Sequence, residues 1–325
     1  MKRNFYINSD GKLRRKENTI YHINTEGNQK PIPIEKIYSI YSYGALTYTS
    51  QCTHLLAKEG VPIHFFNYYG YYDGTFYPKE TYLSGKVTVN QSQHYLEKNK
   101  RLELAKEFIR GSVGNTKRNL KRYKLNNLHQ KIEENEKELE EAEEITEVMN
   151  IEGRIRSIYY KSFDDILPDR FNYTSRSRQP PQNMVNCLIS FGNSLLYSTT
   201  ISEIYNSQLD PTVSFLHEPR ERRFSLALDI ADVFKPLIVD RTIYYLVNKG
   251  MLDPSHFDDD VNKCLLNEDG RKKFQKRYEE TLNRTIKHRD VKKNVSYQRL
   301  IRLECYKLVK HILGSEKYEA FQIWW

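Results

Sequence analysis

Two carboxylates three residues apart give one segment of this sequence a clear chemical signature. Asp229 and Asp232 follow Ser225, a residue type that often caps a helix, in a run whose apolar residues recur with helical spacing. On a helix both carboxylates project from the same side, where each raises the pKa of the other. A divalent metal would relieve this repulsion, and so would pairing with Lys235. The alternative is an ordinary solvated helix face with an acidic N-terminal half.

Two further side chains are candidate ligands, although each is weak evidence alone. His217 precedes the aspartate segment, and a single histidine is more often structural than a metal ligand. Glu152 lies on a predicted helix, where a glutamate is ordinarily a surface residue. Gly153 would let a phosphate approach this helix, and Arg154 and Arg156 are suited to bind one.

Several enzyme classes and cell compartments are disfavoured by what the sequence lacks. It contains no P-loop, no G-x-G-x-x-G, no G-x-S-x-G and no H-E-x-x-H motif. The 4 cysteines are far apart and form no C-x-x-C pair, which disfavours zinc ribbons and disulfide scaffolds. Neither a signal-peptide core nor a stretch near the ~18 apolar residues of a membrane span is present. We therefore expect a cytoplasmic protein without a membrane partner.

The charge of the chain is unevenly distributed. The net charge is +9, but residues 131–147 alone carry −7, so the rest of the chain carries +16. Residues 271–325 hold 15 basic and 6 acidic side chains. A basic surface of this kind attracts polyanions, and nucleic acid is the partner we expect. Anionic lipid is a weaker candidate because no apolar anchor accompanies the charge.

Basic residues on predicted helices are the candidate DNA contacts. They would neutralise backbone phosphates and make binding sensitive to salt, although each of them could equally serve solubility. The tyrosine-rich hairpin 67–77 could stack on bases, but packing within a hairpin or interface is the more common role. The basic candidates are Arg101, Lys106, Arg110, Lys117, Arg118, Lys121, Arg122, Lys272, Lys273, Lys276 and Arg277.

The hydrophobic periodicity predicts an α+β protein with a β-sandwich-like N-terminal domain and a larger all-α catalytic domain. The expected domains are 1–80 and 91–325, joined by a linker at 81–90. Short β-branched and aromatic runs separated by turns predict strands at 4–8, 12–15, 19–24, 32–41 and 61–66, with one helix at 49–60 that Gly60 ends.

Beyond residue 90 the pattern is helical. A helix is expected from Leu96 to Gly111, a second over 115–125, and further helices follow after residue 181. The acidic run 131–147 is expected to be a solvated helix face that continues directly to Glu152. No internal repeat or low-complexity linker is visible.

A series of segments in a defined order carries a resemblance over nearly the whole chain. These segments are Leu13–Tyr21, Ile32–Ile37, Val61–Gly70, Ile151–Gly153, Arg178–Pro181, Asn186–Asn193, Phe215–Arg220, Ser225–Asp229 and Phe234–Pro236. Together they resemble the CRISPR-associated adaptation integrases, the Cas-one family. The last three segments match best, whereas Asn193 departs from the tyrosine that the family usually has there.

The resemblance implies a metal site and a reaction. Glu152, His217 and Asp232 would hold Mn²⁺ or Mg²⁺, with Asp232 a shorter variant of the glutamate found in many members. An imidazole with carboxylate oxygens suits either ion, which would activate a 3′ hydroxyl for attack on a phosphodiester. Members insert short DNA duplexes, the spacers, into a CRISPR array as part of antiviral defence, and they also cut branched DNA.

The resemblance also implies supporting residues and partners. Asp229 would orient a water or the histidine, Lys235 would contact phosphate, and Tyr197 would lie near the site. The family is homodimeric through its β domain, and two dimers flank a dimer of the small Cas-two protein. Two other interpretations stay open, namely a non-catalytic DNA-binding subunit and a structure-selective nuclease that does not integrate.

Overall fold

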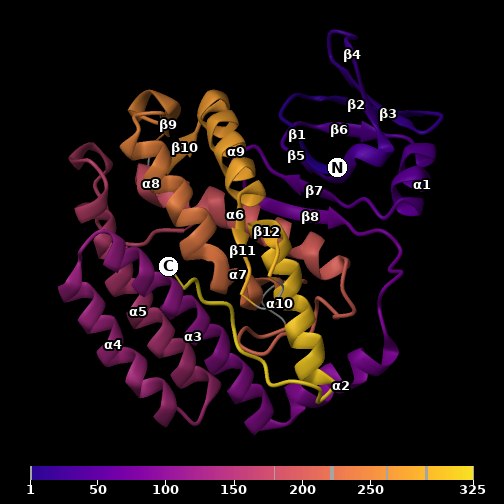
Figure 1. Cartoon of the computed structure of the whole chain (residues 1–325). Coiled ribbons are helices and arrows are strands. Elements are labelled where there is room, and N and C mark those ends of the chain that lie inside the picture. Colours follow the sequence, from indigo (N-terminus) through magenta and orange to yellow (C-terminus); the bar gives the residue numbers. More distant parts are fainter. Residues whose placement is uncertain (1, 179, 220–222, 261–262, 290–291, 325) are drawn as a thin grey trace. The chain divides into compact units, whose positions relative to one another are not determined.

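The computed structural model describes the chain except residues 1, 179, 220–222, 261–262, 290–291 and 325. It divides into two compact units, Met1–Thr81 and Tyr82–Trp325. Strands dominate the first unit and long helices the second (Figure 1), so the predicted α+β class is confirmed. Two residues of the sequence motifs, Gln179 and Arg220, lie outside the described residues.

Two four-stranded sheets make up the N-terminal unit. The first has the order β1 (Arg3–Ile7), β5 (Ile37–Ser42), β7 (Ile63–Phe66) and β8 (Tyr72–Phe76), with only the β7–β8 pair antiparallel. The second has the order β4 (Gln29–Pro33), β3 (Thr19–Asn24), β2 (Gly11–Lys16) and β6 (Leu46–Tyr48). The single strand predicted at 32–41 is wrong, because a 3₁₀ turn at Ile34–Lys36 divides it between the two sheets.

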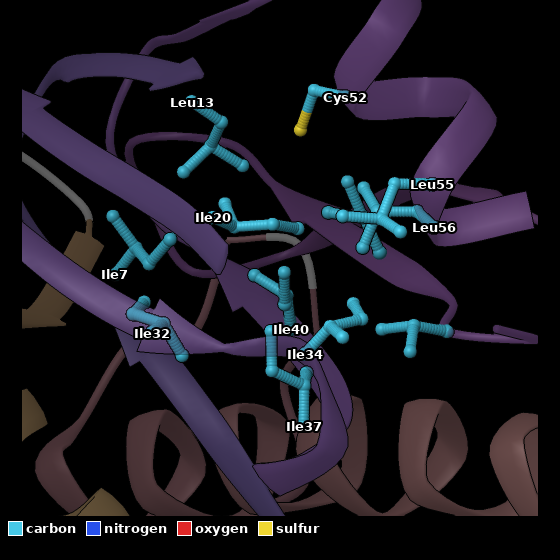
Figure 2. Packing of buried hydrophobic residues seen from close by; sticks show 12 residues of the cluster. Ile7, Leu13, Ile20, Ile32, Ile34, Ile37, Ile40, Cys52, Leu55 and Leu56 are labelled. Carbon is cyan, nitrogen blue, oxygen red and sulfur yellow. The ribbon is translucent and has the colours of Figure 1, made fainter. Parts of the chain in front are cut away.

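Aliphatic side chains from both sheets and one helix form the core of this unit. Figure 2 shows Cys52 and Leu55 of α1 (Ser50–Lys58) facing the isoleucines of the strands. The N-cap of α1 is Thr49, whose hydroxyl accepts a hydrogen bond from the backbone N–H of Cys52 at 3.3 Å. Gly60 follows the helix with a φ of +65°, which glycine adopts without strain. Both predicted ends of this helix are confirmed to within two residues.

The second unit is mainly helical. Its helices are α2 (Gly85–Leu96), α3 (Lys98–Arg122), α4 (Asn126–Glu141), α5 (Ile145–Ile166), α6 (Met184–Tyr205), α7 (Leu226–Lys235), α8 (Arg241–Asn248), α9 (Glu268–Asn283) and α10 (Tyr297–Ile312). Two antiparallel strand pairs depart from the predicted all-α domain, β9 (Phe257–Asp260) with β10 (Lys263–Leu266) and β11 (Thr285–Lys287) with β12 (Asn294–Ser296). α2 begins inside the expected linker. None of the helices described has the length and apolar character that a membrane span requires.

One long helix, α3, replaces the two that the sequence predicts. Gly111 lies in its middle and does not end it. A Cβ added at Gly111 would lie 2.5 Å from the Cβ of Ala320 and 3.3 Å from Cγ1 of Val233. The glycine therefore permits close packing of the C-terminal segment and α7 on α3, which local sequence cannot indicate.

The acidic run does not continue straight into the helix of Glu152. The chain leaves the helical conformation at Ala142, and α5 begins at Ile145 with a capping box between Glu144 and Glu147. α3, α4 and α5 lie side by side (Figure 1). Acidic side chains of α4 form ion pairs with basic side chains of α3 and α5. The predicted solvated acidic face is confirmed, since eight of the nine glutamates of 131–147 are exposed, although several of them form ion pairs within the chain.

Candidate metal centre

The aspartates of α7 lie in the interior of the helical unit. α7 packs against α3 and α6, and most of its residues are buried. Asp229 and Asp232 are 0% and 1% exposed, so the solvated-face alternative is wrong. Ser225 is the N-cap residue of the helix, as predicted, but its side chain makes no capping hydrogen bond, because its hydroxyl donates to the carbonyl of Thr212 at 3.0 Å. Buried carboxylates need partners for every lone pair that water no longer serves.

Asp229 fixes the loop that carries His217. Its carboxylate accepts hydrogen bonds from the backbone N–H groups of Phe215, Leu216 and His217 at 2.7, 3.1 and 3.0 Å. The same carboxylate lies 2.8 Å from Nδ1 of His217. With Nδ1 engaged in this way, Nε2 is the imidazole nitrogen that could bind a cation.

The environment of His217 favours its protonated form. Burial lowers the pKa of the imidazole, but the hydrogen bond and charge of Asp229, together with the charge of Asp232, outweigh burial, so the pKa is raised. Protonation of the ring and coordination of a metal by Nε2 exclude one another.

Asp232 is held between two cations. Its carboxylate contacts the ammonium of Lys235 and lies 3.2 Å from Nη2 of Arg156. Burial alone would raise the pKa of this carboxyl, but Lys235 and Arg156 lower it well below its usual range. Burial also lowers the pKa of Lys235, although Asp232 opposes the shift.

Glu152 contacts the same guanidinium from within its own helix, α5. Oε1 of Glu152 contacts Nη2 of Arg156 one turn further along α5. This oxygen is buried and accepts no hydrogen bond of good geometry among the described residues. A single nitrogen of Arg156 thus links carboxylates from α5 and α7, and it marks a position where positive charge is stabilised.

The donor types here fit a divalent metal of the Mn²⁺ or Mg²⁺ class. Two carboxylates and an imidazole supply hard oxygen ligands and one nitrogen, and Glu152 has an oxygen that lacks a hydrogen bond. Within the described part of the chain, no three His, Cys, Asp or Glu side chains already converge on a common metal position. Arg156 and Lys235 instead supply the positive charge between the carboxylates.

The other predicted site residues have different surroundings. Lys235 is paired with Asp232, and its contact with phosphate stays a prediction. Tyr197 is buried in α6, the helix that packs against α7, and its place near the chemistry stays a prediction. Arg156 is one of the two arginines that follow Glu152 in the sequence. Its spacing of four residues from Glu152 is the sequence signal that could have predicted their ion pair.

Most of the predicted DNA contacts already have partners. Arg110 pairs with Glu107 and Glu140, and Lys117 with Glu133 and Glu136. Lys106 donates to a backbone carbonyl, while Lys272, Lys273 and Arg277 pair with acids on their own helix. Five candidates are exposed, namely Arg118, Lys121, Arg122, Lys272 and Lys276, and of these Lys272 is paired with Glu268.

Arg101 has a structural role that the sequence does not reveal. Its Nε donates to the carbonyl of Phe215 at 2.9 Å, and Nη2 contacts Glu218 at 2.6 Å. The guanidinium also lies over the ring of Tyr95, 4.4 Å from its centroid. Arg101, which belongs to α3, therefore holds the loop of His217 in addition to Asp229, which belongs to α7.

Comparison with known proteins gives consistent matches over the whole chain. The family model described as CRISPR associated protein Cas1 matches residues 5–280. The CRISPR-associated endonuclease Cas1 of Methanothermobacter thermautotrophicus is 53% identical over 324 residues, covering 100% of this chain and 96% of that protein. A solved CAS1 protein from Thermotoga maritima has a TM-score of 0.91 at 40% identity, covering 98% of this chain and 100% of that one. A casposase bound to an integration product has a TM-score of 0.86, covering 98% of this chain and 92% of that one, and its 22% identity shows likeness of fold alone.

Proposed function

The chain belongs to the CRISPR-associated Cas1 (Cas-one) family, and from that premise we propose that it is the DNA endonuclease and integrase of spacer adaptation, acting through the site formed by α5, α7 and the loop of His217. The reaction class is phosphoryl transfer, with DNA as substrate. We assign the divalent metal to Glu152, His217 and Asp232.

One observation carries the assignment of the ligands. Carboxylates from two helices share one guanidinium nitrogen, and the helix of Asp232 also supplies the carboxylate that fixes His217. Burying these charges costs free energy that an ordinary helix pair would avoid. A cluster of this composition is the environment expected for a cation that binds phosphate oxygens.

The residues of the chain prepare the site for this chemistry. A bound divalent metal would lower the pKa of an attacking hydroxyl and neutralise charge on the phosphate. Asp229 engages Nδ1 of His217 in a hydrogen bond, so that Nε2 is the ring nitrogen left to bind a cation. Arg156 and Lys235 keep the pKa of Asp232 low, so that its carboxylate is ionised and ready to bind a cation at neutral pH.

DNA and the Cas-two protein (Cas2) are the partners that we propose. The exposed cations Arg118, Lys121, Arg122 and Lys276 are the best candidates for backbone contacts, since the other candidates are paired within the chain. Homodimerisation through the N-terminal unit, and two such dimers around one Cas2 dimer, belong to the same proposal. Cleavage of branched DNA is the second reaction that we expect at this site.

The function can be tested by incubating the protein and its Cas2 partner with a short duplex bearing 3′ hydroxyls and a plasmid carrying the array. Joined products should form with Mn²⁺ or Mg²⁺ and disappear with EDTA. Glu152→Ala should lower joining and cutting at least 100-fold while DNA binding stays within about twofold, because the metal is lost but the exposed cations are kept.

A matched control is Glu138→Ala, which removes a carboxylate that pairs with Arg154 on the same helix pair but outside the site. It should retain full activity. Full activity in Glu152→Ala would contradict the ligand assignment. Metal-dependent cutting without joining, with or without Cas2, would support a nuclease that does not integrate.

A further inference from the structure

A small cavity lies beside Glu152, one of the proposed metal ligands. It has a volume of about 30 Å³ and is bounded by α3, α5, the end of α7 and the π-helical turn Pro236–Asp240. Glu152, Arg156 and Lys235 line it together with Asp240. Since one water needs about 10–15 Å³ of such space, the cavity has room for about two waters.

Asp240 is a buried acid that the proposed chemistry does not use. It is 3% exposed, and burial is the main reason that its pKa is raised to about 7. A hydrogen bond with the hydroxyl of Tyr159 and the charges of Arg156, Lys235 and Arg241 act in the opposite direction but do not offset burial. A carboxyl in this range holds its proton for about half of the time at neutral pH.

The titratable groups around Asp240 come from three helices, while α6 and α9 also pack against its turn. α5 contributes Arg156, Tyr159 and Tyr160, α7 contributes Lys235, and α8 contributes Arg241 and Tyr244. α3 contributes the uncharged hydroxyls of Ser112 and Thr116 to the cavity.

The surrounding hydrogen bonds hold the acid in a defined position. The hydroxyl of Tyr159 lies 2.9 Å from Nδ2 of Asn119 and 3.0 Å from the hydroxyl of Tyr244. Nδ2 of Asn119 also donates to the carbonyl of Pro236 at 2.8 Å, and its Oδ1 accepts from Nε of Arg241 at 2.8 Å. This network holds the turn that carries Asp240 against α3, α5 and α8.

Charge balance connects Asp240 to the metal site. Without metal, the cations Arg156 and Lys235 are balanced by Glu152 and Asp232. A divalent metal bound to the same carboxylates would add two positive charges and displace Arg156 and Lys235 from them. The carboxylate of Asp240, which lines the same cavity, would then stabilise these two cations.

We propose that Asp240 is a positioning residue that loses its proton when a divalent cation binds to Glu152 and Asp232, so that its carboxylate takes over as counter-ion of Arg156 and Lys235. This inference rests on the proposed function of the site. The O–H bond of the carboxyl breaks, and the proton passes to a water of the cavity and then to the buffer. The electron pair stays on the carboxylate, and no redox partner is required.

The test is a calorimetric titration of the full-length protein with Mn²⁺ in two buffers of different ionisation enthalpy, at pH 6, 7 and 8. At pH 7 the wild type should release about half a proton more per Mn²⁺ than Asp240→Asn. Between pH 6 and 8, Mn²⁺ affinity should rise about tenfold more in the wild type than in Asp240→Asn, because only the wild type has this acid to ionise. The comparison cancels the proton that His217 releases in both proteins.

Two further variants separate positioning from a purely structural role. Tyr159→Phe removes the hydroxyl that lowers the pKa of Asp240, so the pH at which Asp240 contributes should shift upward. Asp253→Asn removes a carboxylate outside the cavity whose pKa is lowered, so it is ionised throughout this range. This control should release as many protons as the wild type.

Equal proton release and equal pH dependence in the wild type and Asp240→Asn would overturn the inference. If Asp240→Asn does not fold, an unchanged pH midpoint in Tyr159→Phe would overturn it instead. Normal Mn²⁺ binding by the wild type and its loss in Glu152→Ala would support the proposed metal site, whatever the result for Asp240. The metal site and the role of Asp240 can therefore fail separately. Failure of the wild type to bind Mn²⁺ would contradict the proposed function and this inference together.

Discussion

Asp229 and Asp232 are three residues apart on α7, yet their carboxylates have different partners. Asp229 accepts three backbone N–H groups and contacts His217, whereas Asp232 is paired with Lys235 and Arg156. The first therefore builds the site, and the second is the carboxylate that we propose as a metal ligand. The two aspartates differ in role because the segment 215–217 lies against Asp229, whereas Arg156 and Lys235 lie against Asp232. The spacing of the two aspartates does not predict this difference.

Replacing Asp229 with Ala should weaken both the fold and the metal site. Three backbone N–H groups would lose their acceptor inside the protein, and each buried donor left without a partner costs about 1–3 kcal/mol. Urea unfolding should show a loss of at least 2 kcal/mol, and Mn²⁺ affinity should fall at least tenfold as His217 loses its orientation. Asp229→Asn keeps an acceptor oxygen and should recover part of the stability but little of the affinity. Unchanged affinity in both variants would contradict the role given to Asp229.

At this scale the residue types were predictable and their partners were not. Two aspartates beside apolar residues indicate a paired or metal-bound carboxylate. Glu152, however, reaches Asp232 only through Arg156, from a helix whose sequence is about 80 residues distant. Asp240 gave no signal at all, because nothing in its sequence neighbourhood distinguishes a buried acid from an exposed one.

Replacing the glycines of two helices with alanine should change the stability of the protein in opposite directions. Gly111 of α3 touches the C-terminal segment, while nothing lies within 4 Å of a Cβ added at Gly153 of α5. We expect Gly111→Ala to destabilise the protein by about 1–3 kcal/mol through overpacking. Gly153→Ala should stabilise it by about 0.5–1 kcal/mol, because alanine is the better helix former.

Thermal and urea unfolding of the two variants give the sign of each change directly. DNA joining by Gly153→Ala is a further readout, since a phosphate that approaches the backbone there would be hindered by the new methyl group. Stabilisation by Gly111→Ala would show that α3 and the C-terminal segment pack less closely than described.

Strands and helix ends were the elements most accessible to sequence analysis. α1 has a local cap at Thr49 and a glycine after its last turn, and both ends were correctly predicted. The division of 32–41 between two sheets, and the continuity of α3 through Gly111, depend on tertiary packing. Local patterns carry no information on either feature.

The uneven charge of the chain serves ion pairs within the protein as well as the contacts with DNA that we propose. The acidic helix α4 pairs with basic residues of α3 and α5, among them Arg110, Lys117 and Arg154. These pairs lower the number of cations that are free to meet DNA. We therefore expect α4 to limit non-specific binding of DNA to this side of the helical unit.

Neutralising α4 should therefore strengthen DNA binding. In the double variant Glu136→Gln and Glu140→Gln, Lys117 and Arg110 lose acidic partners. Affinity for a duplex of unrelated sequence should rise several-fold at low salt, and the slope of log K against log salt should steepen by about one to two. Glu26→Gln and Glu59→Gln, in the N-terminal unit, are a control with the same change of net charge. An equal gain in the control would show that only net charge matters.

The central claim is that Glu152, His217 and Asp232 together bind a divalent metal. Its most direct test is anomalous diffraction from crystals of the wild type grown with Mn²⁺, compared with crystals of Glu152→Ala. We predict an anomalous peak in contact with a carboxylate oxygen of Glu152, Nε2 of His217 and a carboxylate oxygen of Asp232, with Arg156 displaced from between the carboxylates, and no such peak in the variant. A wild-type structure in which Arg156 keeps both contacts and manganese binds elsewhere would contradict the account.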